Sequence, residues 1–181
     1  MRLGATRYAA RSLDDRAGTA ALLLATRAID PARLTHKLVL AWSVREEGGL
    51  EGARALAARI GASVHRAYAI DTFVSSDTPL ESPLFAYAPL GAGAVLRGAD
   101  DGMAAGRAAR ARVQRLAASA GIPLQVGTTQ GSTDVGPFIA AGAPGMGLSW
   151  PGRYSHSPAE VLDLRDLAAL ARLLAVVLTA P

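Results

Sequence analysis

Segments with a helical period alternate with short apolar segments along most of the chain. Residues 37–44 (KLVLAWSV) and 62–70 (ASVHRAYAI) have the length and composition of buried strands, and residues 50–60 between them have a helical pattern that ends at Gly61. Strand–helix–strand units in succession favour a mainly parallel sheet with helices packed on its faces. The sequence therefore predicts an α/β fold, a three-layer αβα sandwich with a largely parallel sheet.

The remaining elements continue this alternation. Helices are expected at residues 15–29, 101–120, 134–141 and 164–179, strands at residues 122–127 and 145–150, and a short strand among the first dozen residues. Apolar residues at helical spacing predict which faces of the first and last helices point into the core. These residues are Ala20, Leu23, Leu24 and Ala28 in the first helix and Leu167, Leu170, Leu174 and Val177 in the last.

The composition excludes several classes of protein. Half of the 181 residues are hydrophobic, which suffices for a sizeable core in one domain spanning residues 1–181. No apolar run reaches about 18 residues, so no membrane partner is expected. The net charge is +4, but the arginines are scattered without interleaved aromatic residues, so nucleic acid is not an expected partner. The lack of cysteine is compatible with a cytoplasmic location and restricts metal ligands to oxygen and imidazole groups.

Acidic residues and one histidine follow the ends of several predicted strands. Glu46 and Glu47 come directly after residues 37–44, Asp71 comes directly after residues 62–70, and His156 lies a few residues beyond residues 145–150. Asp14 opens the helix that follows the N-terminal extended segment. Since ligands bind beyond the carboxyl ends of parallel strands, these side chains are expected to meet at one edge of the sheet.

Carboxylates gathered this closely repel one another unless cations neutralise them. Carboxylates with one or two histidines suit zinc, cobalt or manganese, and a carboxylate that bridges two ions is usual in two-metal hydrolases. Taken singly, the Glu46-Glu47 pair also fits a solvated loop, and the Asp14-Asp15 pair also fits the N-cap of a helix. The combination favours a metallohydrolase. His65, within a predicted strand, and His36, in a polar turn, are not expected to bind metal.

Five sequence blocks resemble one peptidase family. They are SLDDRAG (residues 12–18), VREEGGLEGA (44–53), AIDT (69–72), GSTDVG (131–136) and RYSHSPAEVLDLRDL (153–167). Together, and in this order, they resemble the co-catalytic aminopeptidases of the M42 peptidase family, which includes glutamyl aminopeptidases, tetrahedral TET-type aminopeptidases and proteins once called cellulase M. The resemblance spans nearly the whole chain.

The resemblance implies a role for each matching residue. Asp14 corresponds to the carboxylate that bridges two divalent metals, zinc or cobalt, and Glu46 to the general base. Glu47 and His156 would complete one metal site, and Asp71 would serve the other. The substrate would be a peptide whose N-terminal residue is removed, and the family implies a homo-oligomer. The implied walls of the substrate pocket are Gly131, Thr133, Asp134, Arg153 and Tyr154.

The sequence differs from the family pattern at its N-terminal end. Family members place a His-x-Asp ligand motif and a β-rich dimerisation domain ahead of the Asp14 motif, and this sequence begins without them, so we expect a domain truncated on its N-terminal side. The metal site that shares Asp14 and Asp71 therefore lacks a histidine. The alternatives are a metal-dependent aminopeptidase and a non-catalytic, inactive α/β module that self-associates and binds at most one metal. A third is another co-catalytic peptidase or deacylase acting on amino-acid conjugates.

Overall fold

The structure, a computed structural model, describes residues 1–79, 81–82 and 84–181. Its strands are β1 (Arg2–Leu3), β2 (Arg7–Ala10), β3 (Ala67–Val74), β4 (Ala94–Asp100), β5 (Met103–Ala104), β6 (Leu124–Thr128), β7 (Gly145–Gly152) and β8 (Glu160–Asp163). Its α-helices are α1 (Arg16–Ala28), α2 (Glu51–Ile60), α3 (Arg107–Ser119), α4 (Val135–Ala140) and α5 (Leu164–Thr179). Two short 3-10 helices are η1 (Pro31–Arg33) and η2 (Gly61–Ser63).

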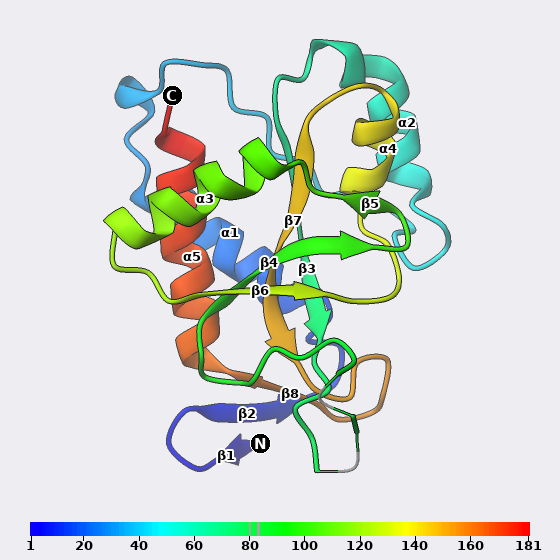
Figure 1. Cartoon of the computed structure of the whole chain (residues 1–181), viewed down its shortest axis with the longest axis vertical. Coiled ribbons are helices and arrows are strands. Elements are labelled where there is room, and N and C mark those ends of the chain that lie inside the picture. Colours follow the sequence, from blue (N-terminus) through cyan, green and yellow to red (C-terminus); the bar gives the residue numbers. More distant parts are fainter. Residues whose placement is uncertain (80, 83) are drawn as a thin grey trace.

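A mixed five-stranded sheet forms the middle layer (Figure 1). The strand order is β3-β7-β4-β5, and β6 pairs with β4. The pairs β3–β7 and β4–β6 are parallel, whereas β4 runs antiparallel to both β7 and β5. Helices α1, α3 and α5 pack on one face of this sheet, and α4, with α2 against it, packs on the other. The predicted αβα sandwich is confirmed, and its sheet is mixed where the sequence predicted a largely parallel one.

A second, antiparallel sheet ties the start of the chain to its C-terminal part. The strand expected among the first dozen residues is present as β2, which pairs with β1 and with β8. At the end of β8 the buried Asp163 caps α5 and pairs with Arg165 at 2.7 Å. The hydrogen bonds from Arg165 lower the pKa of Asp163 to about 2. The pairing of β2 with β8 places the loop after β2 next to the loop before β8.

The two helix faces predicted from apolar spacing have different outcomes. In α5, Leu170, Leu174 and Val177 are buried as predicted. In α1, the predicted face is wrong, because Leu23 and Leu24 are 49% and 58% exposed. The buried residues of α1 are Ala17, Gly18, Ala21, Leu22 and Ala25. These mostly small side chains allow α1 to pack closely against α5. No helix among the described residues is long and apolar enough to cross a bilayer.

Several predicted boundaries differ from the structure. Residues 37–44 form no strand, and Val39, Trp42 and Val44 are exposed, so the prediction of a buried strand is wrong. Strand β3 begins later than predicted and includes Asp71, which therefore lies within the strand rather than beyond it. The helix expected from residue 101 begins at residue 107, because residues 103–104 pair with β4 as β5.

Candidate metal centre and active site

Asp15 caps the N-terminus of α1 at the point where the chain arrives from β2. Its Oδ1 accepts the N–H of Gly18 at 3.1 Å and the indole N–H of Trp150 at 2.7 Å. A Cβ at position 18 would lie 2.3 Å from Asp15 Oδ2, so the glycine leaves room for the carboxylate to fold over the helix end. Burial, opposed in part by the Trp150 hydrogen bond, raises the pKa of Asp15 to about 8, and the charge of Asp14 contributes.

Asp14, Glu47 and His156 come together from three separate loops. One potential ligand atom from each lies within 4.8 Å of the other two. Nε2 of His156 is 3.4 Å from Asp14 Oδ2 and 3.1 Å from Glu47 Oε2. The Asp14 side chain is 8% exposed, whereas those of Glu47 and His156 are 62% and 67% exposed. The group therefore has a buried carboxylate on one side and is open to solvent on the other.

Glu160, at the start of β8, connects two of these loops. Its buried carboxylate accepts the backbone N–H groups of Leu13 and Asp14 at one oxygen and that of His156 at the other. Ser155 adds a hydroxyl hydrogen bond to Asp14 Oδ2. Since the buried carboxylate is fully satisfied by backbone donors, it fixes the separation of the Asp14 and His156 loops.

A second group joins Asp14 and Asp15 to Asp71, again with one potential ligand atom each within 4.8 Å of the others. The cation nearest to Asp71 is the buried Arg97 of β4, whose Nη2 lies 3.8 Å from Asp71 Oδ2. Arg97 is shared, because its Nη1 also donates to Asp100 at 3.2 Å. Burial raises the pKa of Asp71 well above its usual value, and the charge of Arg97 only partly opposes this. This second group therefore has more negative charge than its surroundings neutralise.

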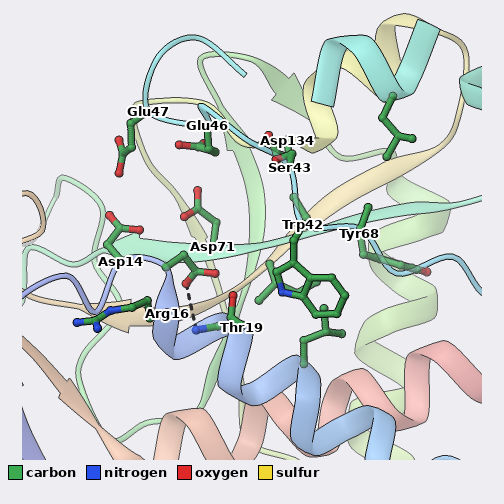
Figure 2. A pocket seen from close by; sticks show the side chains of 17 residues that line it. Asp14, Arg16, Thr19, Trp42, Ser43, Glu46, Glu47, Tyr68, Asp71 and Asp134 are labelled. Carbon is green, nitrogen blue, oxygen red and sulfur yellow. Dashed lines mark hydrogen bonds between the residues drawn. The ribbon is translucent and has the colours of Figure 1, made fainter. Parts of the chain in front are cut away.

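Glu46 lies in the turn that leads into α2, close to the other carboxylates (Figure 2). Burial raises its pKa to about 7, and the charges of Glu47, Asp134 and Asp14 contribute. Ser43 donates a hydrogen bond from its hydroxyl to Asp134 Oδ2 beside it, while Asp134 Oδ1 is buried and has no hydrogen-bond partner in the part of the chain that the structure describes. A carboxylate with a pKa near 7 is suited to exchange a proton with water at neutral pH.

A cavity of about 370 Å³ connects these groups. In Figure 2 the carboxylates of Asp14, Glu46 and Glu47 lie on one side of it and the rings of Trp42 and Tyr68 on the other. The cavity thus has an acidic part and a more apolar part. It is lined by Asp14, Asp15, Arg16, Gly18, Thr19, Leu22, Ala41, Trp42, Ser43, Glu46, Glu47, Leu56, Tyr68, Ala69, Ile70, Asp71 and Asp134.

Only one of the residues predicted to contact substrate lines this cavity, and that residue is Asp134. Arg153 forms a bidentate pair with Asp77, with donor–acceptor distances of 2.6 and 2.9 Å. The Gly131 backbone N–H donates to Asp101, and Thr133 is buried. Tyr154 is 48% exposed, beside the His156 loop. These four residues shape the loops around the site rather than its main cavity.

Sequence reasoning missed three contributors. Glu160 lies in the RYSHSPAEVLDLRDL block, but its function depends on backbone groups that only the fold brings to it. Arg97 lies inside an apolar strand, where an unpaired charge is unfavourable. Its position in the sequence therefore indicated a buried acidic partner. Asp15 joins the second acidic group, although its position had suggested only a helix cap.

The two histidines that were not expected to bind metal lie in neither candidate metal group. His65 is exposed, and His36 contacts the carbonyl of Leu178.

The comparison with known proteins identifies the family. The family model of the M42 glutamyl aminopeptidases matches residues 1–173. The chain belongs to this family. It is 35% identical over 176 residues to "Putative aminopeptidase SgcX" of Escherichia coli (strain K12) and 28% identical over 167 residues to "Putative aminopeptidase" of Acetivibrio thermocellus. These alignments cover 91% of this chain in each case but 46% and 49% of the relatives, so the chain spans about half their length.

Solved structures of aminopeptidases share the fold. The aminopeptidase APDkam598 of Desulfurococcus kamchatkensis superimposes with a TM-score of 0.92 and 30% identity over all of this chain and 51% of its own. The TET1 peptidase of Pyrococcus horikoshii, described as assembling into a tetrahedron or a large octahedral shell, superimposes with a TM-score of 0.87 and 35% identity. That match covers 97% of this chain and 51% of the TET1 chain. The fold predicted from the sequence is therefore that of an M42 catalytic domain.

Proposed function

We propose that this chain is the metal-binding part of an aminopeptidase that removes N-terminal residues from peptides, with Glu46 as general base. The observation that carries the proposal is the convergence of Asp14, Glu47 and His156 within 4.8 Å beside Glu46, whose pKa is about 7. Family membership supports the reaction class.

The side chains present fit a divalent metal. Asp14, Glu47 and His156 supply two carboxylates and one imidazole, a donor set that suits zinc or cobalt. The second group, Asp14, Asp15 and Asp71, supplies only carboxylates. A metal bound here would supply Lewis acidity, lowering the pKa of a water molecule and polarising the scissile carbonyl. We propose two metals per site, with Asp14 shared between them and the Asp71 side the weaker.

Glu46 has the properties that a proton shuttle requires. Its carboxyl group lines the cavity without serving in either candidate ligand group, so it is free to accept a proton from water. With a pKa of about 7 it gives that proton up again at neutral pH, here to the amine that leaves. The half-buried Asp134 beside it adds negative charge that helps to maintain the raised pKa of Glu46.

The decisive variant is Glu46→Gln. It preserves the shape of the side chain and both ligand groups, so zinc or cobalt should bind as to the parent protein in calorimetry. Hydrolysis of amino-acid p-nitroanilides should fall by at least about 100-fold, the usual range for loss of a general base. Glu51→Gln is the matched control, because Glu51 is half exposed and pairs with Arg45 at 3.3 Å. Full activity of Glu46→Gln would exclude the proposed base.

One observation favours the alternative of a non-catalytic module. The carboxylate-only group around Asp71 has no imidazole among the described residues that lie close enough to join it. A chain that binds one metal ion by calorimetry and hydrolyses no aminoacyl p-nitroanilide would be such a module. Turnover with two metals bound would exclude it.

We propose a homo-oligomer as the working form, in the cytoplasm. The support is the assembly of similar proteins, since one TET1 structure is described as a dodecamer and another as a tetrahedron or octahedral shell. Light scattering coupled to gel filtration tests this directly. A monomer at micromolar concentration would contradict it.

A further inference from the structure

Arg97 of β4 reaches across the middle of the sheet to the second acidic group. Strand β7 lies between β3 and β4 (Figure 1), and Arg97 is in register with Gly147 of β7. A Cβ at position 147 would lie 3.0 Å from Cβ of Arg97 and 3.2 Å from its Cδ, so the glycine leaves room for the arginine side chain to lie over β7. The guanidinium group therefore reaches Asp71 of β3, although Arg97 is only 3% exposed.

Two hydrogen bonds fix the guanidinium group beside Asp71. Nη2 of Arg97 donates to the backbone carbonyl of Thr72 in β3, and Nη1 donates to Asp100 at the end of β4 at 3.2 Å. Nη2 also lies 3.8 Å from Asp71 Oδ2, while Asp71 Oδ1 accepts the N–H of Thr72 at 2.8 Å. Arginine stays protonated in proteins, so one oxygen of Asp71 always faces a positive charge that two strands hold in place.

The two candidate metal groups differ in the cation that lies beside them. In the first group, which contains Glu47, the ion pairs join His156 to the carboxylates of the same group. In the second group, which contains Asp15 and Asp71, the carboxylate of Asp71 is paired with Arg97. A divalent cation and a guanidinium group repel each other, and this repulsion is stronger away from bulk water. Binding of a cation to the second group is therefore opposed by a fixed charge that is paired with no member of the first group among the described residues.

We propose that Arg97 sets the order in which the two groups bind metal ions. Acting through Asp71, its guanidinium group offsets part of the negative charge of the second group and lowers the affinity of that group for a divalent cation. The first group therefore fills first, and the second fills only at a higher metal concentration. At low metal concentration Arg97 remains the counter-charge of Asp71. This inference rests on the proposed metal-dependent function, because it requires that both groups can bind metal.

Calorimetric titration with zinc tests the proposal in the parent chain and in two variants, Arg97→Gln and Arg97→Lys. Glutamine removes the charge and keeps an N–H donor for the carbonyl of Thr72, whereas lysine keeps the charge and loses the planar fork. We expect Arg97→Gln to bind the second zinc ion about tenfold or more tightly than the parent chain does, with the first binding event unchanged. Arg97→Lys should keep the weak second event. A role in packing alone would affect the two variants alike.

A variant with the opposite effect covers the case in which Arg97→Gln does not fold, which circular dichroism would show. Asp100 belongs to neither metal group, and its carboxylate offsets the charge of Arg97. Asp100→Asn should therefore weaken the second zinc-binding event by about threefold or more. Asp101→Asn is the matched control, because it removes the same charge from the next residue, which is exposed and accepts the N–H of Gly131.

The proposal is overturned if the second event in Arg97→Gln is unchanged or weaker, or if neither that variant nor the parent chain shows a second event. It is also overturned if Asp100→Asn and Asp101→Asn have equal effects. A second event that appears only in Arg97→Gln supports it. If the parent chain binds no zinc at all, the proposed metal-dependent function fails and this inference fails with it, so the two failures are distinguishable.

Discussion

Glu160 binds the backbone of Asp14 with one carboxylate oxygen, at 3.0 Å, and the backbone of His156 with the other, at 3.1 Å. Asp14 and His156 belong to loops that are far apart in the sequence but meet in one candidate metal group. Neither loop has regular secondary structure to hold its position. The buried carboxylate therefore sets the distance between two proposed ligands without touching the metal position itself.

Glu160→Gln should weaken metal binding while retaining the fold. The side-chain NH2 of glutamine cannot accept a hydrogen bond, yet it would face a backbone N–H that a Glu160 oxygen now accepts. That buried N–H would lose its partner, at a cost of about 1–3 kcal/mol. We expect a lower thermal midpoint and at least about tenfold weaker zinc affinity by calorimetry, the usual effect of removing a residue that orients ligands. Glu81→Gln, on an exposed loop, is the control. Unchanged zinc affinity would show that the loops hold their separation without Glu160.

His156→Ala tests the first metal group directly. It removes the imidazole that lies 3.1 Å from Glu47 and leaves only two carboxylates, which hold zinc weakly. We expect the tighter zinc-binding event in calorimetry to be lost. The chain has three histidines, and the exposed His65 provides the matched control, because His65→Ala should leave zinc binding unchanged. Equal loss in both variants would point to nonspecific binding by surface histidines.

The sequence predicted those parts of the site that depend on local patterns. The sequence placed Asp14, Glu47 and His156 in one group, and the structure brings them together, although the strand expected at residues 37–44 to carry Glu47 does not form. Glu160 could not be assigned, because its partners are backbone groups of two distant loops, and the apolar strand around Arg97 indicated a buried partner without showing that Asp71 is one. Residues 37–44 have the composition of a strand, but composition cannot show whether a neighbouring strand is present to pair with.

The wrong face of α1 has a related cause. Apolar spacing favoured the face with Ala20, Leu23, Leu24 and Ala28, whereas the structure buries a different face, on which Leu22 is the only large side chain among Ala17, Gly18, Ala21 and Ala25. A close approach between α1 and α5 requires small residues, and hydrophobicity alone does not distinguish small from large. In α5 the largest apolar residues do form the buried face, and there the prediction is confirmed.

Arg97→Met should be strongly destabilising in the metal-free protein. Arg97 is the buried cation that faces Asp71 at 3.8 Å and Asp100 at 3.2 Å, and its loss leaves both carboxylates without a paired cation. Removing one member of such a group costs about 3–5 kcal/mol. Denaturant unfolding in a chelator should show this loss, and added zinc should restore part of it by neutralising Asp71. Arg107→Met, on an exposed position of α3, should change stability little. Stability equal to that of the parent protein would contradict the assigned role.

The metal-free protein should become less stable as pH rises from about 5 to about 8. Burial raises the pKa of Asp15 from 3.8 to about 8 and that of Glu46 from 4.5 to about 7. Between the unfolded and folded values of each pKa the folded protein holds a proton that the unfolded chain has released, so the stability contributed by that proton is lost as pH rises through the folded pKa. Asp163, with its pKa of about 2, acts only at more acidic pH.

Asp15→Asn isolates the larger of these two contributions. The amide oxygen retains the hydrogen bonds from Gly18 and Trp150, and the titrating proton is removed. The dependence of the unfolding free energy on pH should therefore become shallower by up to about 1.4 kcal/mol per pH unit between about pH 5 and about pH 7, which is the value of one proton. Denaturant titrations in a chelator at several pH values measure this slope, with the exposed Asp101→Asn as control. If Asp15→Asn leaves the slope as it is in the parent protein, the buried acid that titrates in this range is not Asp15.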